Sequence, residues 1–268
     1  MRANGRPRIE QELRKVQSRE KRLEKIALEQ SGTAWKQQLE EKIPLKVYTG
    51  LNSAFCKAFS VIFDRGSAVI EKTYCKEELE ADHKVRDYAV RLKGGRKELR
   101  HMQKSAKKTD LVNLAATTLE GLALGLLGIG LPDIVLFLGT LLRGTYEMAL
   151  SYGSDHDTPQ ERLLILKMMQ TSLSRGEEWL SGDAEVERML RAEAAAVTQE
   201  QIKQQIEQTA SVFATDMLLL KFVQGLPVIG VLGGAANPIY YHKIMRYVEL
   251  KYRKRYLLRL MDTKPCEH

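Results

Sequence analysis

Helical periodicity runs through the whole chain, and no other feature restricts the fold as strongly. After Thr198, apolar residues recur along one helix face at Ile202, Ile206, Phe213, Met217 and Leu220. No stretch of the 268 residues alternates apolar and polar side chains as a half-buried strand does. Thr158-Pro159-Gln160-Glu161, and Thr198 with Gln201, match the pattern that caps the first turn of a helix. The sequence therefore predicts an all-α, multi-helix bundle.

The N-terminal 44 residues have the composition of a charged helical arm that ends at Pro44. We predict three segments: this arm (1–44), an all-α domain (45–262) and a short tail (263–268). We expect the arm to protrude from the bundle. The apolar stripe within residues 9–26 has the spacing of a packing seam, which indicates a partner helix and possible self-association through this segment.

Two glycine-rich apolar stretches are the least common part of the sequence. Val112 to Leu142 contains five glycines and only two charged residues, and Phe222 to Tyr241 contains four glycines and no acid or base. Both contain Gly-Leu-Pro, at 130–132 and 225–227, which indicates a weak internal repeat of helix, tight turn and helix.

Neither stretch has the length of a regular pair of membrane-spanning helices. A spanning helix needs about 20 apolar residues. Pro132-Asp133 divides the first stretch, and Pro227 and Pro238 bracket only ten residues of the second. Two structures remain open for these hairpins: a buried core, or a shallow contact with one leaflet of a membrane.

Positive charge is concentrated in three places rather than spread evenly. Residues 1–46 hold 12 basic and 7 acidic side chains, residues 84–108 hold 10 and 2, and residues 243–264 hold 8 and 2. The second basic segment leads into the first apolar hairpin, and the third follows the second hairpin. Basic clusters beside apolar segments are typical of proteins attracted to anionic lipid, although a solvated helix face explains the basic runs equally well.

This pattern predicts a non-enzymatic protein that is cytoplasmic and peripheral at the inner face of the cell membrane. Its expected partners are anionic lipid or a membrane transporter complex, and we expect neither a cofactor nor a metal. The alternative is a soluble carrier or regulator that encloses an apolar ligand. Asp133 and Asn237 fit helix caps, but Asp133 could instead be a buried acid paired with Arg143 or with a basic residue of the C-terminal run. The candidate contact residues are Asp133, Arg143, Asn237, Tyr241, Arg253, Lys254 and Arg255.

Several segments resemble the EcsC family of bacterial proteins. The likeness lies in Gly121 through Asp133, in Tyr152-Gly153 with the helix cap after it, and in 226–237 with the basic run that follows. The family takes its name from a gene beside those of an ABC transporter, and the resemblance implies no established activity and no catalytic residues.

Catalytic and metal-binding signatures are nearly absent from the sequence. It contains no Walker loop, no GxSxG and no HExxH, and its three cysteines form no CxxC pair. Asp155-His156-Asp157 could suggest a metal, but we interpret it as the loop that leads into the cap at Thr158. A hydrolase using Asp133 and His156, and a nucleic-acid binder using the basic run, are less well supported than lipid binding.

Overall fold

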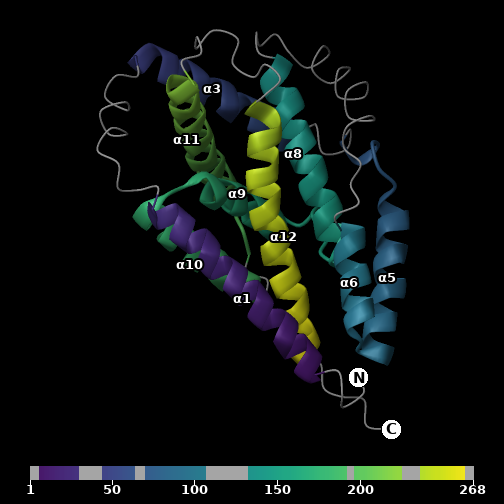
Figure 1. The fold of residues 1–268 in the computed structure, drawn as a ribbon. Coiled ribbons are helices and arrows are strands. Elements are labelled where there is room, and N and C mark those ends of the chain that lie inside the picture. Colours follow the sequence, from purple (N-terminus) through teal and green to yellow (C-terminus); the bar gives the residue numbers. More distant parts are fainter. Residues whose placement is uncertain are drawn as a thin grey trace.

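The computed structural model describes residues 6–29, 44–63, 70–106, 132–191, 196–224 and 236–262. Within these ranges the regular elements are helices, which confirms the predicted all-α bundle (Figure 1). In chain order they are α1 (Arg6–Glu29), α3 (Leu45–Val61), α5 (Lys76–Lys93), α6 (Arg96–Ala106), α8 (Pro132–Ser151), α9 (Pro159–Leu173), α10 (Gly176–Arg191), α11 (Gln199–Gln224) and α12 (Ala236–Asp262).

Both predicted helix caps are confirmed. Thr158 Oγ1 accepts a hydrogen bond from the Glu161 N–H at 3.2 Å, and Pro159 occupies the first turn of α9. At the start of α11 the Gln201 N–H donates to Thr198 Oγ1 at 3.2 Å, and the Thr198 N–H donates to Gln201 Oε1 at 2.8 Å. Each cap satisfies backbone N–H groups that have no partner inside the helix.

The sequence also predicts a long polar helix over about 67–92, with a break at 64–66 before it and Gly94-Gly95 at its end. In the structure this helix is shorter at its start. Residues 72–75 form a turn, and α5 begins at Lys76. Its end is as predicted, because Gly94 adopts a left-handed conformation with φ of 57° and its N–H donates to the Val90 carbonyl at 2.7 Å. Glycine suits this position because it has no Cβ to clash. The break predicted at residues 64–66 lies outside the described residues.

One hydrophobic core joins the helices. Phe55 and Phe59 of α3 meet Phe213 of α11 at ring-centroid distances of 5.4 and 5.6 Å, and Phe137 of α8 meets the same ring at 6.3 Å. Along the face predicted for α11, Ile202, Ile206, Phe213 and Met217 are buried and Leu220 packs against the core. The contacts of α11 with α3 and α9 bury this face.

The long helix α12 runs through the middle of the molecule. It contacts α1, α8, α9 and α10, and in Figure 1 it lies between the α1–α10 side and the α8 side. Every residue from 247 to 257 is buried. This interior segment includes four of the eight basic residues of the third basic stretch, so the fold encloses charges that the sequence analysis placed at a surface.

The N-terminal helix does not protrude, so that part of the predicted architecture is wrong. α1 lies along α12 and α10, and Ile9 and Val16 are fully buried in the common core. The predicted boundary at residue 44 therefore does not separate two cores among the described residues. The apolar stripe within residues 9–26 was predicted to pack against a partner helix, with self-association as one possibility. In the structure α12 and α10 of the same chain cover its most buried residues, Ile9 and Val16.

At the opposite edge, α5 and α6 form a pair beside α8 (Figure 1). Val90 is the one residue of α5 that is buried. Polar contacts hold the helix in place: the ring Nδ1 of His83 lies 3.0 Å from the Ser151 carbonyl oxygen, and the Tyr256 hydroxyl donates to Asp87 at 2.9 Å. Among the described helices, none covers the face of α5 that points away from α8.

Candidate functional site

The basic run of α12 lies inside the protein. Arg253, Lys254 and Arg255 are 6–7% exposed. Arg253 donates to Glu12 of α1 at 2.5 Å, and Lys254 donates to Glu20 of α1 at 2.7 Å. Arg255 is bidentate, donating to the two carboxylate oxygens of Glu161 at 2.9 and 2.5 Å.

In this arrangement none of these three candidate contact residues faces the outside. The sequence could not show this because the carboxylates that pair with them lie in distant segments. The Arg253–Glu12 and Arg255–Glu161 bonds, for example, join residues 241 and 94 positions apart. The carboxylates of the same chain therefore neutralise the basic run of α12 inside the protein.

Lys251 forms the centre of the same buried network. Its ammonium lies 2.7 Å from Glu20, 2.9 Å from Asp183 and 2.6 Å from Glu187, and its side chain is fully buried. Burial by itself lowers the pKa of Lys251, but these three carboxylates outweigh burial and the net direction is upward. Burial raises the pKa of Glu187, and Lys251 and Lys254 outweigh it so that the net direction is downward. Lys251 and Glu187 are therefore charged at neutral pH, and the ion pairs of this network tie α1, α10 and α12 together.

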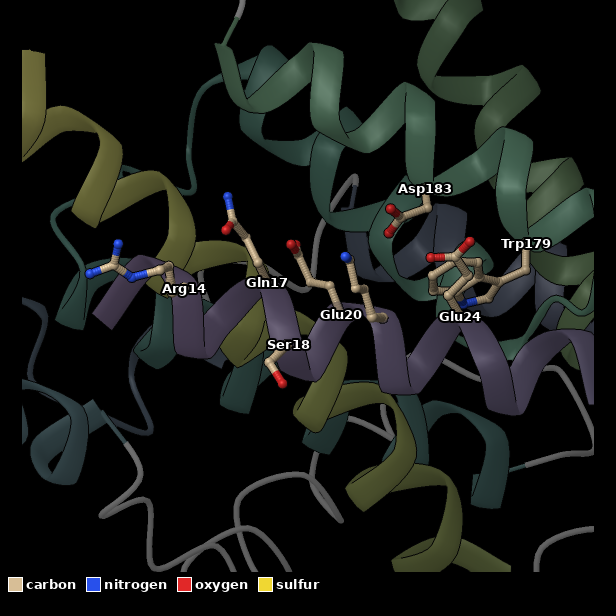
Figure 2. A pocket seen from close by; sticks show the side chains of 8 residues that line it. Arg14, Gln17, Ser18, Glu20, Glu24, Trp179 and Asp183 are labelled. Carbon is tan, nitrogen blue, oxygen red and sulfur yellow. The ribbon is translucent and has the colours of Figure 1, made fainter. Parts of the chain in front are cut away.

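A polar groove of about 670 Å³ lies above this network, between α1 and α10 (Figure 2). It is lined by Arg14, Gln17, Ser18, Glu20, Lys21, Glu24, Trp179 and Asp183. Two of its carboxylates, on Glu20 and Asp183, already pair with Lys251 beneath them. The charged side chains that remain in the lining, Arg14, Lys21 and Glu24, sum to only +1, which is too small a surplus to select a ligand by charge.

Arg143 and Tyr241 lie at the contact between α8 and α12. Arg143 is buried, and its Nε donates to Glu147 one turn along α8 at 2.9 Å. Burial raises the pKa of Glu147, and Arg143 acts against this rise. Tyr241 is partly buried, and its hydroxyl occupies the space that a side chain at Gly144 would need. Tyr241 therefore contributes to the packing of α12 against α8. The carboxylate that pairs with Arg143 is Glu147 of the same helix.

The two remaining candidates fall outside the described side chains. Asp133 and Asn237 belong to helices α8 and α12, but the structure does not describe their side chains. Residues 107–131 and 225–235, which contain most of the first predicted helical hairpin before Pro132 and the Gly-Leu-Pro site of the second, also lie outside the described residues. The choice between a buried hairpin and one that contacts lipid therefore stays a prediction.

An exposed apolar stripe lies on the outer face of α5. Val85, Tyr88 and Leu92 are 69%, 67% and 46% exposed. Their spacing of three and four residues places them on one side of the helix, opposite the side that buries Val90. Isolated exposed apolar residues are ordinary, but a stripe of three on one helix face marks a contact surface.

Cations without acidic partners surround this stripe. Lys84, Lys93, Lys97, Arg100 and Lys104 are exposed, and none pairs with a carboxylate among the described residues. Asp82 pairs with Arg86 and Asp87 with Arg91, whereas Glu98 of α6 forms no ion pair among the described residues and offsets part of this positive charge. An open pocket of about 290 Å³ between the two helices is lined by Val85, Arg86, Ala89, Lys93, Lys97, Glu98 and His101.

We call this region the α5–α6 surface, defined by the three apolar and five unpaired basic residues above. The sequence analysis identified the basic part of this surface, because residues 84–108 are the most positively charged stretch of the chain. The apolar stripe was missed. Its spacing is visible in the sequence, but only the packing shows which side of α5 is turned away from the core.

Together the described residues define an all-α protein with an exposed cationic and apolar helix pair at one edge. The model of the EcsC protein family matches residues 8–257, so the chain belongs to that family. The match covers residues 8–29 of α1, which the sequence analysis had assigned to a separate N-terminal arm. No curated protein and no solved structure matches the chain.

One described helix is long and apolar enough to cross a membrane by composition alone. This is the segment Ile134–Ser151 of α8, and 89% of it is buried inside the protein. A core helix of a globular fold has the same length and composition, and here α8 packs against α3, α5, α6 and α12.

Proposed function

We propose that this EcsC-family protein binds reversibly to the surface of an anionic membrane through the α5–α6 surface. The observation that carries the proposal is the placement of Val85, Tyr88 and Leu92 on the solvent side of α5, among cations that lack acidic partners. Apolar side chains can enter the headgroup zone while lysine and arginine meet lipid phosphates. No catalytic role is part of this proposal.

The charges set the expected strength of binding. Each lysine or arginine near an anionic membrane contributes about 1 kcal/mol, so the five unpaired cations contribute about 5 kcal/mol at low salt. Burying the apolar stripe adds to this at about 25 cal/mol per Å² of apolar area. Such binding is reversible and weakens as salt screens the charges.

Charge and shape distinguish this surface from the other basic segments. The basic run of α12 is neutralised by carboxylates of the same chain, whereas the cations of the α5–α6 surface face solvent. A nucleic acid would also attract cations, but the centre of this surface is an aliphatic and aromatic stripe, which suits a membrane better. For the alternative of a carrier that encloses an apolar ligand, no supporting observation was found in the described residues.

The test is flotation of the full chain with vesicles of neutral phosphatidylcholine, with and without 30% phosphatidylglycerol. We expect binding only to the anionic vesicles, and less binding as salt rises. Replacing Lys93, Lys97 and Arg100 by glutamine removes about 3 kcal/mol, which lowers the partition coefficient about 100-fold.

A matched triple variant, with Lys46, Lys57 and Lys203 changed to glutamine, removes the same net charge from exposed positions elsewhere. It should bind nearly as well as the unaltered protein. No binding to anionic vesicles, or an equal loss in both triple variants, would overturn the proposal. For the apolar part, Leu92→Ser should weaken binding at moderate salt, while Leu45→Ser, at another exposed leucine, should not.

A further inference from the structure

A second cluster of functional groups lies where the loop between α8 and α9 meets the turn before α5. His156 Nδ1 is 3.3 Å from Asp157 Oδ1 and 4.0 Å from Glu71 Oε1. One ligand atom from each of the three residues lies within 4.8 Å of the other two. Glu71 lies 85 positions before His156 in the chain. The sequence shows His156 next to Asp157, and only the fold brings Glu71 beside them.

The histidine ring is held firmly and points into this cluster. Its side chain is 1% exposed, and it stacks on Tyr146 with a centroid distance of 4.2 Å and an interplanar angle of 10°. Its far nitrogen, Nε2, lies 2.9 Å from the Tyr74 hydroxyl. A hydrogen bond to the outer nitrogen is the usual device that orients a histidine ligand toward a metal.

The imidazole of His156 and the hydroxyl of Tyr74 can distribute their protons to fit either a metal-free or a metal-bound state. Burial lowers the pKa of His156, so the ring is neutral and carries one N–H. The Tyr74 hydroxyl can donate to Nε2 or accept from it, according to which ring nitrogen carries the proton. When a cation takes Nδ1, the proton resides on Nε2 and is donated to the Tyr74 oxygen, because a phenol can accept as well as donate.

The two carboxylates favour a cation between them. Oε1 of Glu71 and Oδ1 of Asp157 both lie within 4.0 Å of Nδ1 of His156, so two carboxylate oxygens and one ring nitrogen gather around one point. Lys76 pairs with Oδ2 of Asp157 and leaves Oδ1 facing the histidine, with Arg162 3.9 Å from that oxygen. A lysine on one carboxylate oxygen orients the other toward the cluster.

We propose that Glu71, His156 and Asp157 bind one divalent cation of the zinc class. One imidazole nitrogen with carboxylate oxygens is a donor set that Zn²⁺ accepts, whereas Mg²⁺ and Ca²⁺ prefer oxygen ligands alone. Three protein ligands leave one coordination position open. Side chains of Glu71 and Asp157 that are 29% and 36% exposed allow water to reach that position. The proposal is independent of membrane binding.

The test is titration of the full chain, stripped of metal with a chelator, with Zn²⁺ alone. Calorimetry should give one site per chain, and zinc should stay with the protein after desalting. Because zinc binds the folded state, the melting temperature at a hundredfold excess over the dissociation constant should rise by about 5 °C or more. Glu71→Gln should lower the affinity at least tenfold.

Asp155→Asn is the matched control, because Asp155 lies in the same loop and contacts the same Lys76 but is not one of the three ligands. It should bind zinc like the unaltered protein. The proposal is overturned if no stoichiometric zinc binds, or if the Glu71 and Asp155 variants behave alike. Glu71 is partly exposed, so its variant should fold and decide the question even where a His156 variant does not.

Discussion

Replacing Lys251 by methionine tests whether the buried ionic network stabilises the fold. Methionine keeps most of the volume of the side chain but removes the ammonium that three carboxylates share. Lys254 still contacts Glu20 and Glu187, so Asp183 loses the one ionic partner that it has among the described residues and keeps the Tyr247 hydroxyl. Removing one member of a buried pair typically costs 3–5 kcal/mol. The remaining contacts place the expected cost at the lower limit, about 3 kcal/mol at pH 7.

The pH dependence separates this charge effect from simple loss of packing. The pKa of Glu187 is lowered by folding, so its pairing energy is present above its ordinary pKa of 4.5 and disappears as pH falls through the lower folded value. The penalty of Lys251→Met should therefore shrink in acid, because protonated carboxylates no longer need the ammonium. For Lys251 the pKa is raised, so its contribution persists at neutral pH and is lost only as pH rises above 10.5.

The assay is urea unfolding followed by circular dichroism at pH 7 and pH 4, with Lys203→Met as an exposed control. We expect the free energy of unfolding at pH 7 to fall by about 3 kcal/mol in the Lys251 variant and by little in the control. A cost below 1 kcal/mol at pH 7, or a cost that is the same at both pH values, would refute the reasoning.

Two further predictions concern the loop that joins α8 to α9 and its surroundings. Gly153→Ala should destabilise the protein by about 1–3 kcal/mol in urea unfolding, because Gly153 has a φ of 72° and the new methyl group would meet the His83 ring; an unchanged midpoint would contradict the assigned backbone conformation. Burial lowers the pKa of His156, so in metal-free protein its ring should titrate below pH 6.5 by NMR, and stability should fall as pH drops from 6.5 toward that midpoint. A midpoint above 6.5 would show that the ring is paired with a carboxylate strongly enough to outweigh burial.

Much of the fold could be predicted from local sequence. The caps at Thr158 and Thr198 and the glycine stop of α5 form as predicted, because each depends on residues within one helical turn. The buried face of α11 follows from its apolar spacing for the same reason. The family resemblance is confirmed by the match over residues 8–257.

The candidate site was less predictable, because a charge count does not show what each charge faces. Residues 84–108 and 243–264 look alike in sequence, as basic stretches with two acids each. In the fold, Arg253 and Arg255 meet Glu12 and Glu161, whereas Lys97 of α6 meets no acid among the described residues. The prediction of a protruding N-terminal helix was wrong for a related reason. An apolar stripe on α1 indicates that another surface packs against the helix, but it does not indicate which surface that is.

Helix type, helix ends and family membership were thus decided by the amino-acid sequence, since they follow from interactions between near neighbours. Tertiary structure alone decided which cations are enclosed, which face of α5 is left bare and which acid stands beside His156. These outcomes depend on residues that are far apart along the chain. Their proximity is set by how the helices pack, and the pattern of any single segment contains no information about it.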